Sequence, residues 1–179
     1  MKDRAANAQI NLSEQQLIDC SSSYGNQGCN GGWIESVLKF HKDKGVTTEA
    51  AYPYTQTAGS CKIATGGSYK ISSYQGGQLS GCNALTAMVT GRPVAIAVAA
   101  GSDYWRTYAG GILNKCGTGI DHGVLLVGVY YNSATNVNYW KIKNSWGPNW
   151  GEKGYLRLSR AELGGNLCDI CSYGFYPIL

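Results

Sequence analysis

Residues 144–151 of this 179-residue chain read Asn-Ser-Trp-Gly-Pro-Asn-Trp-Gly (NSWGPNWG). Strands are predicted on both sides of this stretch, at residues 138–143 and 154–159. In the second strand Tyr155, Arg157 and Ser159 alternate with two leucines, which is typical of a strand with one buried face. The stretch therefore connects two strands in a β-rich part of the chain.

The β-rich character extends back to about residue 82. Residues 94–98 (VAIAV) and 123–131 are further strand candidates. Asn83 is expected to cap a short helix over residues 84–90, which Gly91 and Pro93 end. Residues 82–179 are therefore predicted to form one β-rich domain.

Residues 1–81 are predicted to be helical, with glycine-rich turns. Ser13-Glu14-Gln15-Gln16 has the form of a capping box and predicts a helix that ends near Cys20. After a polar loop, apolar residues at helical spacing from Ile34 to His41 predict a second helix, capped by Gly45. Residues 46–81 are predicted to be loop with short strands. No internal repeat, low-complexity tract or flexible linker is present.

Composition narrows the possible partners. The net charge is +4 and charged residues make up 15% of the chain, with no run of Lys or Arg, so no nucleic-acid partner is expected. No apolar stretch is long enough to cross a membrane, and residues 1–20 lack a signal-peptide pattern. Seven cysteines indicate disulfides and an oxidising or lysosomal compartment, and the odd number leaves one thiol without an intrachain partner.

Five motifs together resemble the papain and cathepsin L-like family of cysteine proteases. They are residues 12–20 (LSEQQLIDC), 28–32 (GCNGG), 121–123 (DHG), 144–151 and the ending 173–177 (YGFYP). The resemblance implies an α+β fold with two lobes and a substrate cleft between them. Residues 1–81 are the expected helical left lobe, and residues 82–179 the β-barrel right lobe that carries the catalytic His and Asn.

The resemblance also implies roles for individual residues. His122 is the expected general base and acid, Asn144 orients its imidazole, and Trp146 shields their hydrogen bond from water. The alternative for His122 is an ordinary polar residue in an apolar strand. His41 matches no motif and is expected to be a packing or surface histidine.

Substrate binding is expected at the glycine turn and at an apolar pocket. Gly31 and Gly32 let a backbone approach closely, so that an extended peptide can pair there, although a simple tight turn is the alternative. By resemblance, the remaining substrate-binding residues are Trp33, Ile34, Ala97, Ile120, Asp121 and Tyr173. The bulk of Tyr173 predicts a shallow apolar subsite.

The cysteines are assigned mainly by resemblance. Cys20 is expected to pair with Cys61, and Cys116 with Cys168. A Cys82–Cys171 pair is a hypothesis that leaves only Cys29 as a free thiol. The C-x-x-C spacing of Cys168 and Cys171 admits a redox or zinc site as an alternative, but no second ligand pair accompanies it.

The family's C-G-[SA]-C-[WY] segment, which contains the nucleophile, does not occur in the 179 residues. We therefore expect an N-terminally truncated chain that lacks the nucleophilic Cys and the oxyanion Gln and is inactive alone. In the family, the partner of Cys29 also lies in that segment. At about 25 cal/mol per Å², loss of its helix costs on the order of 10 kcal/mol, so the helical lobe is not expected to hold unaided.

The expected function of the complete form is peptide-bond hydrolysis by an endopeptidase, through a thioester acyl-enzyme and without metal or cofactor. A non-enzymatic pseudoprotease or peptide-binding fragment is the alternative, and a broken copy whose product is degraded is a third possibility. Expected partners are a polypeptide substrate and the missing N-terminal segment or a pro-segment. The family implies a monomer in a lysosome or vacuole, or outside the cell. Residues 11–13 also form a glycosylation triplet.

Overall fold

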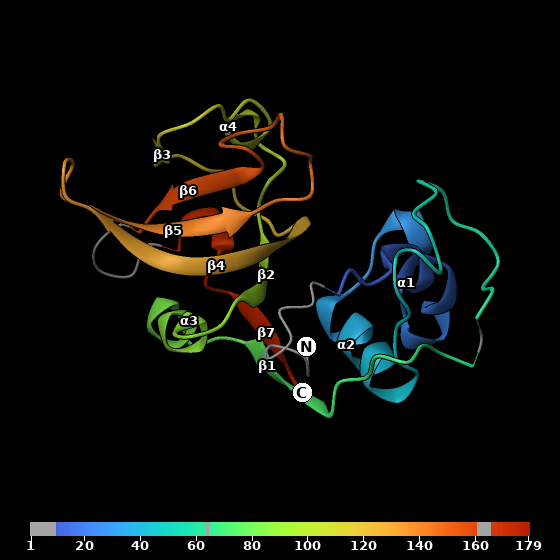
Figure 1. Cartoon of the computed structure of the whole chain (residues 1–179). Coiled ribbons are helices and arrows are strands. Elements are labelled where there is room, and N and C mark those ends of the chain that lie inside the picture. The colour runs from blue at the N-terminus through green and yellow to red at the C-terminus, as the bar shows by residue number, and fades with distance from the viewer. Residues whose placement is uncertain (1–9, 64, 161–165) are drawn as a thin grey trace. The chain divides into compact units, whose positions relative to one another are not determined.

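The computed structural model describes residues 10–63, 65–160 and 166–179. The chain divides into two compact units (Figure 1). The first runs to Gln75 and includes Pro177–Leu179, and the second is Gly76–Tyr176. The assignment of residues 1–81 and 82–179 to the two lobes of a cleft stays a prediction.

The first unit is built around two helices, α1 (Glu14–Cys20) and α2 (Ile34–Asp43), with short 3-10 turns η2 (Ser22–Tyr24) and η3 (Gly28–Asn30) between them. Ser13 caps α1, because its Oγ accepts a hydrogen bond from the Gln16 N–H at 3.0 Å. The Gln16 side chain does not return to the cap. Its Oε1 instead accepts from the Thr47 N–H at 2.7 Å and so holds the segment that follows α2.

A small core stabilises the first unit. Leu38, Phe40, Val46, Tyr52 and Ile71 are its buried apolar side chains. The end of α2 is as predicted: Gly45 follows the C-cap residue Lys44 with a φ of +79°. A Cβ at Gly45 would lie 2.4 Å from the Gly67 carbonyl oxygen, so the close backbone approach here also requires glycine.

A seven-stranded mixed sheet dominates the second unit. Its strand order is β1-β7-β2-β4-β5-β6-β3. The strands are β1 (Ser73–Gln78), β2 (Val94–Val98), β3 (Ile112–Leu113), β4 (His122–Asn132), β5 (Val137–Lys143), β6 (Tyr155–Ser159) and β7 (Tyr173–Ile178), of which β1 and β7 extend across the limits of the unit. β4, β5 and β6 are antiparallel neighbours, and β3 runs parallel to β6 at the edge.

Three short helical elements accompany the sheet: α3 (Cys82–Val89), α4 (Asp103–Arg106) and η4 (Leu167–Asp169). The prediction that Asn83 caps α3 is wrong, because the cap residue is Gly81, with a φ of +123°. α4, η4 and β3 were not predicted, because two to four residues are too few for a periodic pattern. α3 lies against β4 (Figure 1) and contributes Leu85 and Val89 to the core.

The core of the second unit is built around two tryptophans. Trp105 and Trp140 are fully buried among aliphatic side chains of β2, β4, β5 and β6. The Trp105 Nε1–H points to both sulfurs of the Cys116–Cys168 disulfide, at 3.3 and 3.0 Å. None of the helices in the described part of the chain has the length and apolar character needed to cross a lipid bilayer.

Candidate active site

His122 is the first residue of β4, where it pairs with Val98 of β2. The preceding residue, Asp121, fixes this end of the strand. Its N–H donates to the Val98 carbonyl at 3.1 Å, and its Oδ1 accepts from the Ala100 N–H at 2.7 Å. Pairing with β2 and the two hydrogen bonds of Asp121 thus hold the backbone at His122 in place.

Asn144 reaches His122 from the end of the neighbouring strand β5. Its side chain is 8% exposed, and its Oδ1 lies 2.8 Å from Nε2 of His122. The Ser145 N–H donates to the same oxygen at 2.8 Å, so the atom facing the ring is an acceptor. We therefore assign the proton to Nε2, which in that tautomer leaves the lone pair on Nδ1. The arrangement leaves Nδ1 as the atom that can take a proton.

Trp146 lies over the imidazole. The ring centroids of Trp146 and His122 are 5.2 Å apart, and the planes are inclined by 33°. Trp146 is itself 40% exposed and meets Trp150 edge to face at 5.2 Å. Trp150 stacks on the buried Trp105 and donates from Nε1 to the Trp105 carbonyl at 3.1 Å. A row of aromatic rings thus connects the imidazole to the core.

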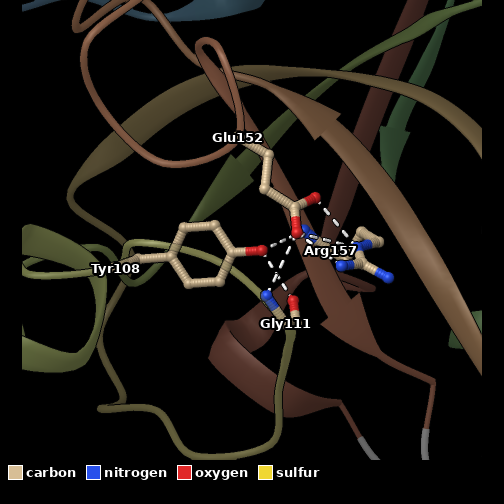
Figure 2. Close-up of polar contacts among 4 residues, drawn as sticks. All are labelled: Tyr108, Gly111, Glu152 and Arg157. Carbon is tan, nitrogen blue, oxygen red and sulfur yellow. Dashed lines mark hydrogen bonds and ion pairs between the residues drawn. The ribbon is translucent and has the colours of Figure 1, made fainter.

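A polar network holds the other end of the loop that carries Asn144 and Trp146 (Figure 2). Glu152 accepts two hydrogen bonds from Nε of Arg157, at 3.1 and 2.8 Å, and another from its Nη2. Its Oε1 also accepts from the Gly111 N–H at 3.1 Å. The Tyr108 hydroxyl donates to the Gly111 carbonyl at 2.6 Å and accepts from the Arg157 N–H at 3.2 Å.

The charges of this network stabilise one another. The Arg157 side chain holds the pKa of Glu152 below its ordinary value through their hydrogen bonds. Burial raises the pKa of Tyr108. Sequence reasoning did not find Glu152, Arg157 or Tyr108. The available signals were the acidic residue directly after the NSWGPNWG stretch and an arginine on the half-buried strand β6.

The glycine turn lies in the first unit. Gly31 has a φ of +113°, and a Cβ on Gly32 would lie 2.3 Å from Oδ1 of Asn26. That oxygen accepts from the Trp33 N–H at 2.9 Å, so Gly32 makes room for a hydrogen bond that shapes the turn. The backbone conformation at Gly31 and the close contact at Gly32 thus explain why glycine occupies these positions. The role of both residues in peptide binding stays a prediction.

The other predicted substrate-binding residues lie in both units. Trp33 and Ile34 stand at the start of α2 in the first unit, and Trp33 is 70% exposed. In the second unit, Ala97 pairs with Gly123, next to the Val98–His122 pair, and Ile120 and Asp121 directly precede His122. Tyr173 precedes Gly174, which pairs with Ile96. The structure therefore brings Ala97, Ile120 and Asp121 close to His122, and their contact with a substrate stays a prediction.

Disulfides join Cys20 to Cys61, Cys82 to Cys171 and Cys116 to Cys168, and Cys29 is an exposed free thiol within the described residues. These are the pairs named from the sequence. The two cysteines of the C-x-x-C motif are bonded to different partners rather than to each other, so this structure does not contain a dithiol pair at that motif.

The chain belongs to the papain family of cysteine proteases: the sequence profile described as "Papain family cysteine protease" matches residues 1–178. It is 42% identical over 178 residues to Cathepsin L 1 of Paramecium tetraurelia. The alignment covers 99% of this chain and 52% of that protein. It is 40% identical over 177 residues to Vignain of Vigna mungo, with 96% and 48% covered. The chain thus spans about half the length of these curated relatives.

Solved structures show the same fold. Bromelain from Ananas comosus, solved with the inhibitor E64, superposes with a TM-score of 0.86 at 34% identity. The superposition covers 96% of this chain and 80% of the bromelain chain. Procathepsin L 3 of Tenebrio molitor larval midgut gives 0.87 at 39% identity, with 98% and 58% covered. The predicted family and the α+β papain-like fold are therefore confirmed.

Proposed function

We propose that this chain carries the proton-transfer half of a cysteine endopeptidase site, with His122 as general base and acid and Asn144 as its orienting partner. The observation that carries the proposal is the 2.8 Å contact between Nε2 of His122 and Oδ1 of Asn144. A ring protonated at Nε2 and free at Nδ1 can form an ion pair with a nearby thiol, the state that makes sulfur nucleophilic.

We propose that the nucleophile lies outside these 179 residues. Six of the seven cysteines are held in disulfides. The seventh, Cys29, belongs to the glycine turn. The family resemblance implies that the cysteine at this position forms a structural disulfide. The proposal therefore includes that this chain does not hydrolyse peptides by itself, since catalytic groups that act as a unit fail together.

An apolar surface on the first unit supports the existence of such a segment. Leu17 and Ile18 of α1 and Ile34 and Val37 of α2 line a shallow pocket beside the exposed Trp33. Cys29 is exposed on the turn between these helices. A helix that covers this surface and bridges to Cys29 would bury the apolar side chains and pair the remaining thiol.

The proposed reaction has two stages. The thiolate attacks the peptide carbonyl carbon, the C–N bond breaks, and His122 delivers its Nδ1 proton to the leaving amine. Water then attacks the thioester while Nδ1 takes its proton, and the carboxylic acid and thiolate are released. Proton carrier and nucleophile suffice for this cycle, so no metal or organic cofactor is required.

The proposed substrate is an extended polypeptide that pairs with the backbone at Gly31 and Gly32. By the family resemblance, Trp33, Ile34, Ala97, Ile120 and Tyr173 are the residues proposed to recognise the substrate's second side chain. A pro-segment is proposed as a second partner, and a lysosomal, vacuolar or extracellular compartment as the setting for a monomer.

The test begins with the native transcript, whose coding region upstream of the Met1 codon identifies the complete protein. In that protein, His122→Ala is expected to lower kcat/KM on a fluorogenic peptide by about 10²–10⁴-fold. His41→Gln serves as the matched control and should leave kcat/KM near the parent value. Equal activity of the parent and the His122→Ala variant would refute the proposal. Peptide binding without hydrolysis in the complete protein would favour a pseudoprotease.

A further inference from the structure

The sequence contains a single Asn-x-Ser/Thr triplet, Asn11-Leu12-Ser13, at the entrance to α1. Such a triplet is the acceptor for N-linked oligosaccharides when its middle residue is not proline. The proposed catalytic function does not use Asn11. Its structural setting decides whether the amide can carry a large polar group.

The side chain of Asn11 is exposed on a fixed piece of backbone. Leu12 forms an antiparallel bridge with Thr48. On either side of the bridge, the Asn11 carbonyl accepts from the Glu49 N–H at 2.9 Å, and the Ser13 N–H donates to the Thr47 carbonyl at 3.0 Å. These two backbone hydrogen bonds hold the segment without using the Asn11 side chain, and a group attached to the exposed Asn11 amide would extend into solvent.

Ser13 is in the opposite situation. It is 1% exposed, and its hydroxyl donates to the Tyr52 carbonyl at 2.6 Å while it accepts from the Gln16 N–H at 3.0 Å. The hydroxyl of the triplet is the feature that a glycosylating enzyme must recognise in addition to the amide. In the folded chain this hydroxyl is fully engaged and covered, so recognition has to precede the docking of α1 on the segment that contains Tyr52.

We propose that Asn11 is an N-glycosylation site that is modified before α1 docks. This rests on the proposed lysosomal, vacuolar or extracellular route, since the donor is a lipid-pyrophosphate-linked oligosaccharide of the secretory pathway. Nδ2 of Asn11 attacks the anomeric carbon of the donor, and a C–N bond replaces the C–O bond to pyrophosphate. The amide proton passes to a base of the transferase, and the lipid pyrophosphate leaves. No atom changes oxidation state.

The glycan would cover the turn next to Asn11. In this turn, which follows the bridged residue Thr48, Ala50 and Ala51 are exposed. Small exposed residues in such a connection are preferred sites of proteolytic nicking. A glycan on Asn11 is therefore expected to slow cleavage at residues 50–51.

The site is tested with the full chain fused to a heterologous signal peptide in a eukaryotic cell. We expect a lower mobility in total cell protein that an N-glycosidase abolishes, with Asn11 converted to Asp in the peptide map. Asn11→Gln removes the shift entirely. Ser13→Thr keeps it, because threonine retains both the acceptor hydroxyl and the helix cap. Asn83→Gln, at an exposed asparagine outside any triplet, is the matched control and also keeps it.

The order of events is tested in solution with a solubilised transferase and a lipid-linked oligosaccharide. We expect the chain to be modified when it is reduced and unfolded and to be refractory once it is folded and oxidised. Equal modification of both forms would refute the order of events, and an unshifted parent protein in the cell would refute the site. The signal peptide is supplied, and both experiments detect glycosylation and not peptide hydrolysis. A negative result here therefore does not contradict the proposed function, and loss of the proposed function does not contradict the glycosylation site.

Discussion

The Glu152 carboxylate and the Arg157 guanidinium form a two-point ion pair across the turn that leads into β6. Through Oε1 of Glu152 this pair also holds the Gly111 N–H. The loop between Asn144 and Glu152 is therefore anchored at both ends, at one end by the contact with His122 and at the other by this pair. A change at Glu152 should consequently be detectable at the imidazole.

The first prediction concerns Glu152→Gln. An amide keeps one acceptor for Gly111 but loses the charge that pairs with Arg157, and we expect a loss of about 1–2 kcal/mol in the free energy of unfolding. We also expect altered NMR signals of the His122 ring, because the loop that carries Asn144 is loosened. The measurements are urea unfolding and ring-nitrogen NMR, which is simple in a chain with two histidines.

Glu35→Gln is the matched control for that variant. Glu35 pairs with Lys39 at 3.0 Å on the exposed face of α2, where ion pairs contribute about 0.5 kcal/mol or less. We expect a correspondingly small loss of stability and an unchanged His122 ring. Identical His122 spectra in the parent and the Glu152→Gln variant would show that the ion pair does not position the loop.

The second prediction concerns the tautomer of His122. Because Oδ1 of Asn144 accepts from Nε2, the neutral ring should carry its proton almost entirely at Nε2. Asn144→Ala removes this restraint, and we expect a mixture of both tautomers in the ring-nitrogen spectrum. Asn138→Ala, on the preceding strand, serves as the control. A mixed population already present in the parent would contradict the assignment.

The third prediction concerns pH and His41. This side chain is buried near the end of α2, its Nε2 has no hydrogen-bond partner among the described residues, and burial lowers its pKa. In acid the unfolded chain therefore binds the proton more readily than the folded chain. The free energy of unfolding should fall as pH drops below about 6.5, with a slope from this one group of at most about 1.4 kcal/mol per pH unit.

His41→Gln should remove this part of the pH dependence, while His122→Gln should retain it. The measurement is urea unfolding at a series of pH values between about 5 and 8, a window that spans the ordinary histidine pKa. A parent curve that runs parallel to that of His41→Gln across the series would contradict a buried, neutral His41.

The fourth prediction concerns Gly32. A Cβ at this position would lie 2.3 Å from Oδ1 of Asn26, so Gly32→Ala should displace that side chain and break its bond to the Trp33 N–H. We expect a loss of about 1–3 kcal/mol in urea unfolding. Gly59→Ala is the control, since its Cβ would meet its nearest neighbour at an ordinary 3.7 Å. Equal stability of the two variants would show that the turn adapts without cost.

Periodic patterns in the sequence predicted the longer elements well. The helices α1 and α2 and the strands β2 and β5 lie close to their predicted positions, because each displays several residues of a repeating pattern. The predicted start of α3 was wrong by two positions, since the cap residue is Gly81 and not Asn83. β7 was not predicted as a strand, because Gly174 and Pro177 interrupt its pattern and its register depends on pairing with the distant strand β2.

The candidate site likewise has one part that the sequence predicted and one part that it did not. The motifs identified His122 and Asn144 as candidates, and the structure places their side chains in contact. The network of Tyr108, Gly111, Glu152 and Arg157 joins residues 108–111 to residues 152–157, and no local pattern records contacts between residues 41 and 49 positions apart. The unexpected dual function of Ser13, as helix cap and as partner of the Tyr52 carbonyl, likewise depends on a residue 39 positions away.

The contact between the Trp105 indole and the Cys116–Cys168 disulfide gives the second unit an optical reporter. An excited indole can transfer an electron to an adjacent disulfide, so we expect emission from Trp105 to be quenched while the bond is intact. Reduction of this bond should therefore brighten the protein, whereas loss of Cys82–Cys171 should leave the emission unchanged. Formation of the Cys116–Cys168 bond should therefore be detectable by fluorescence, without a label and during refolding itself.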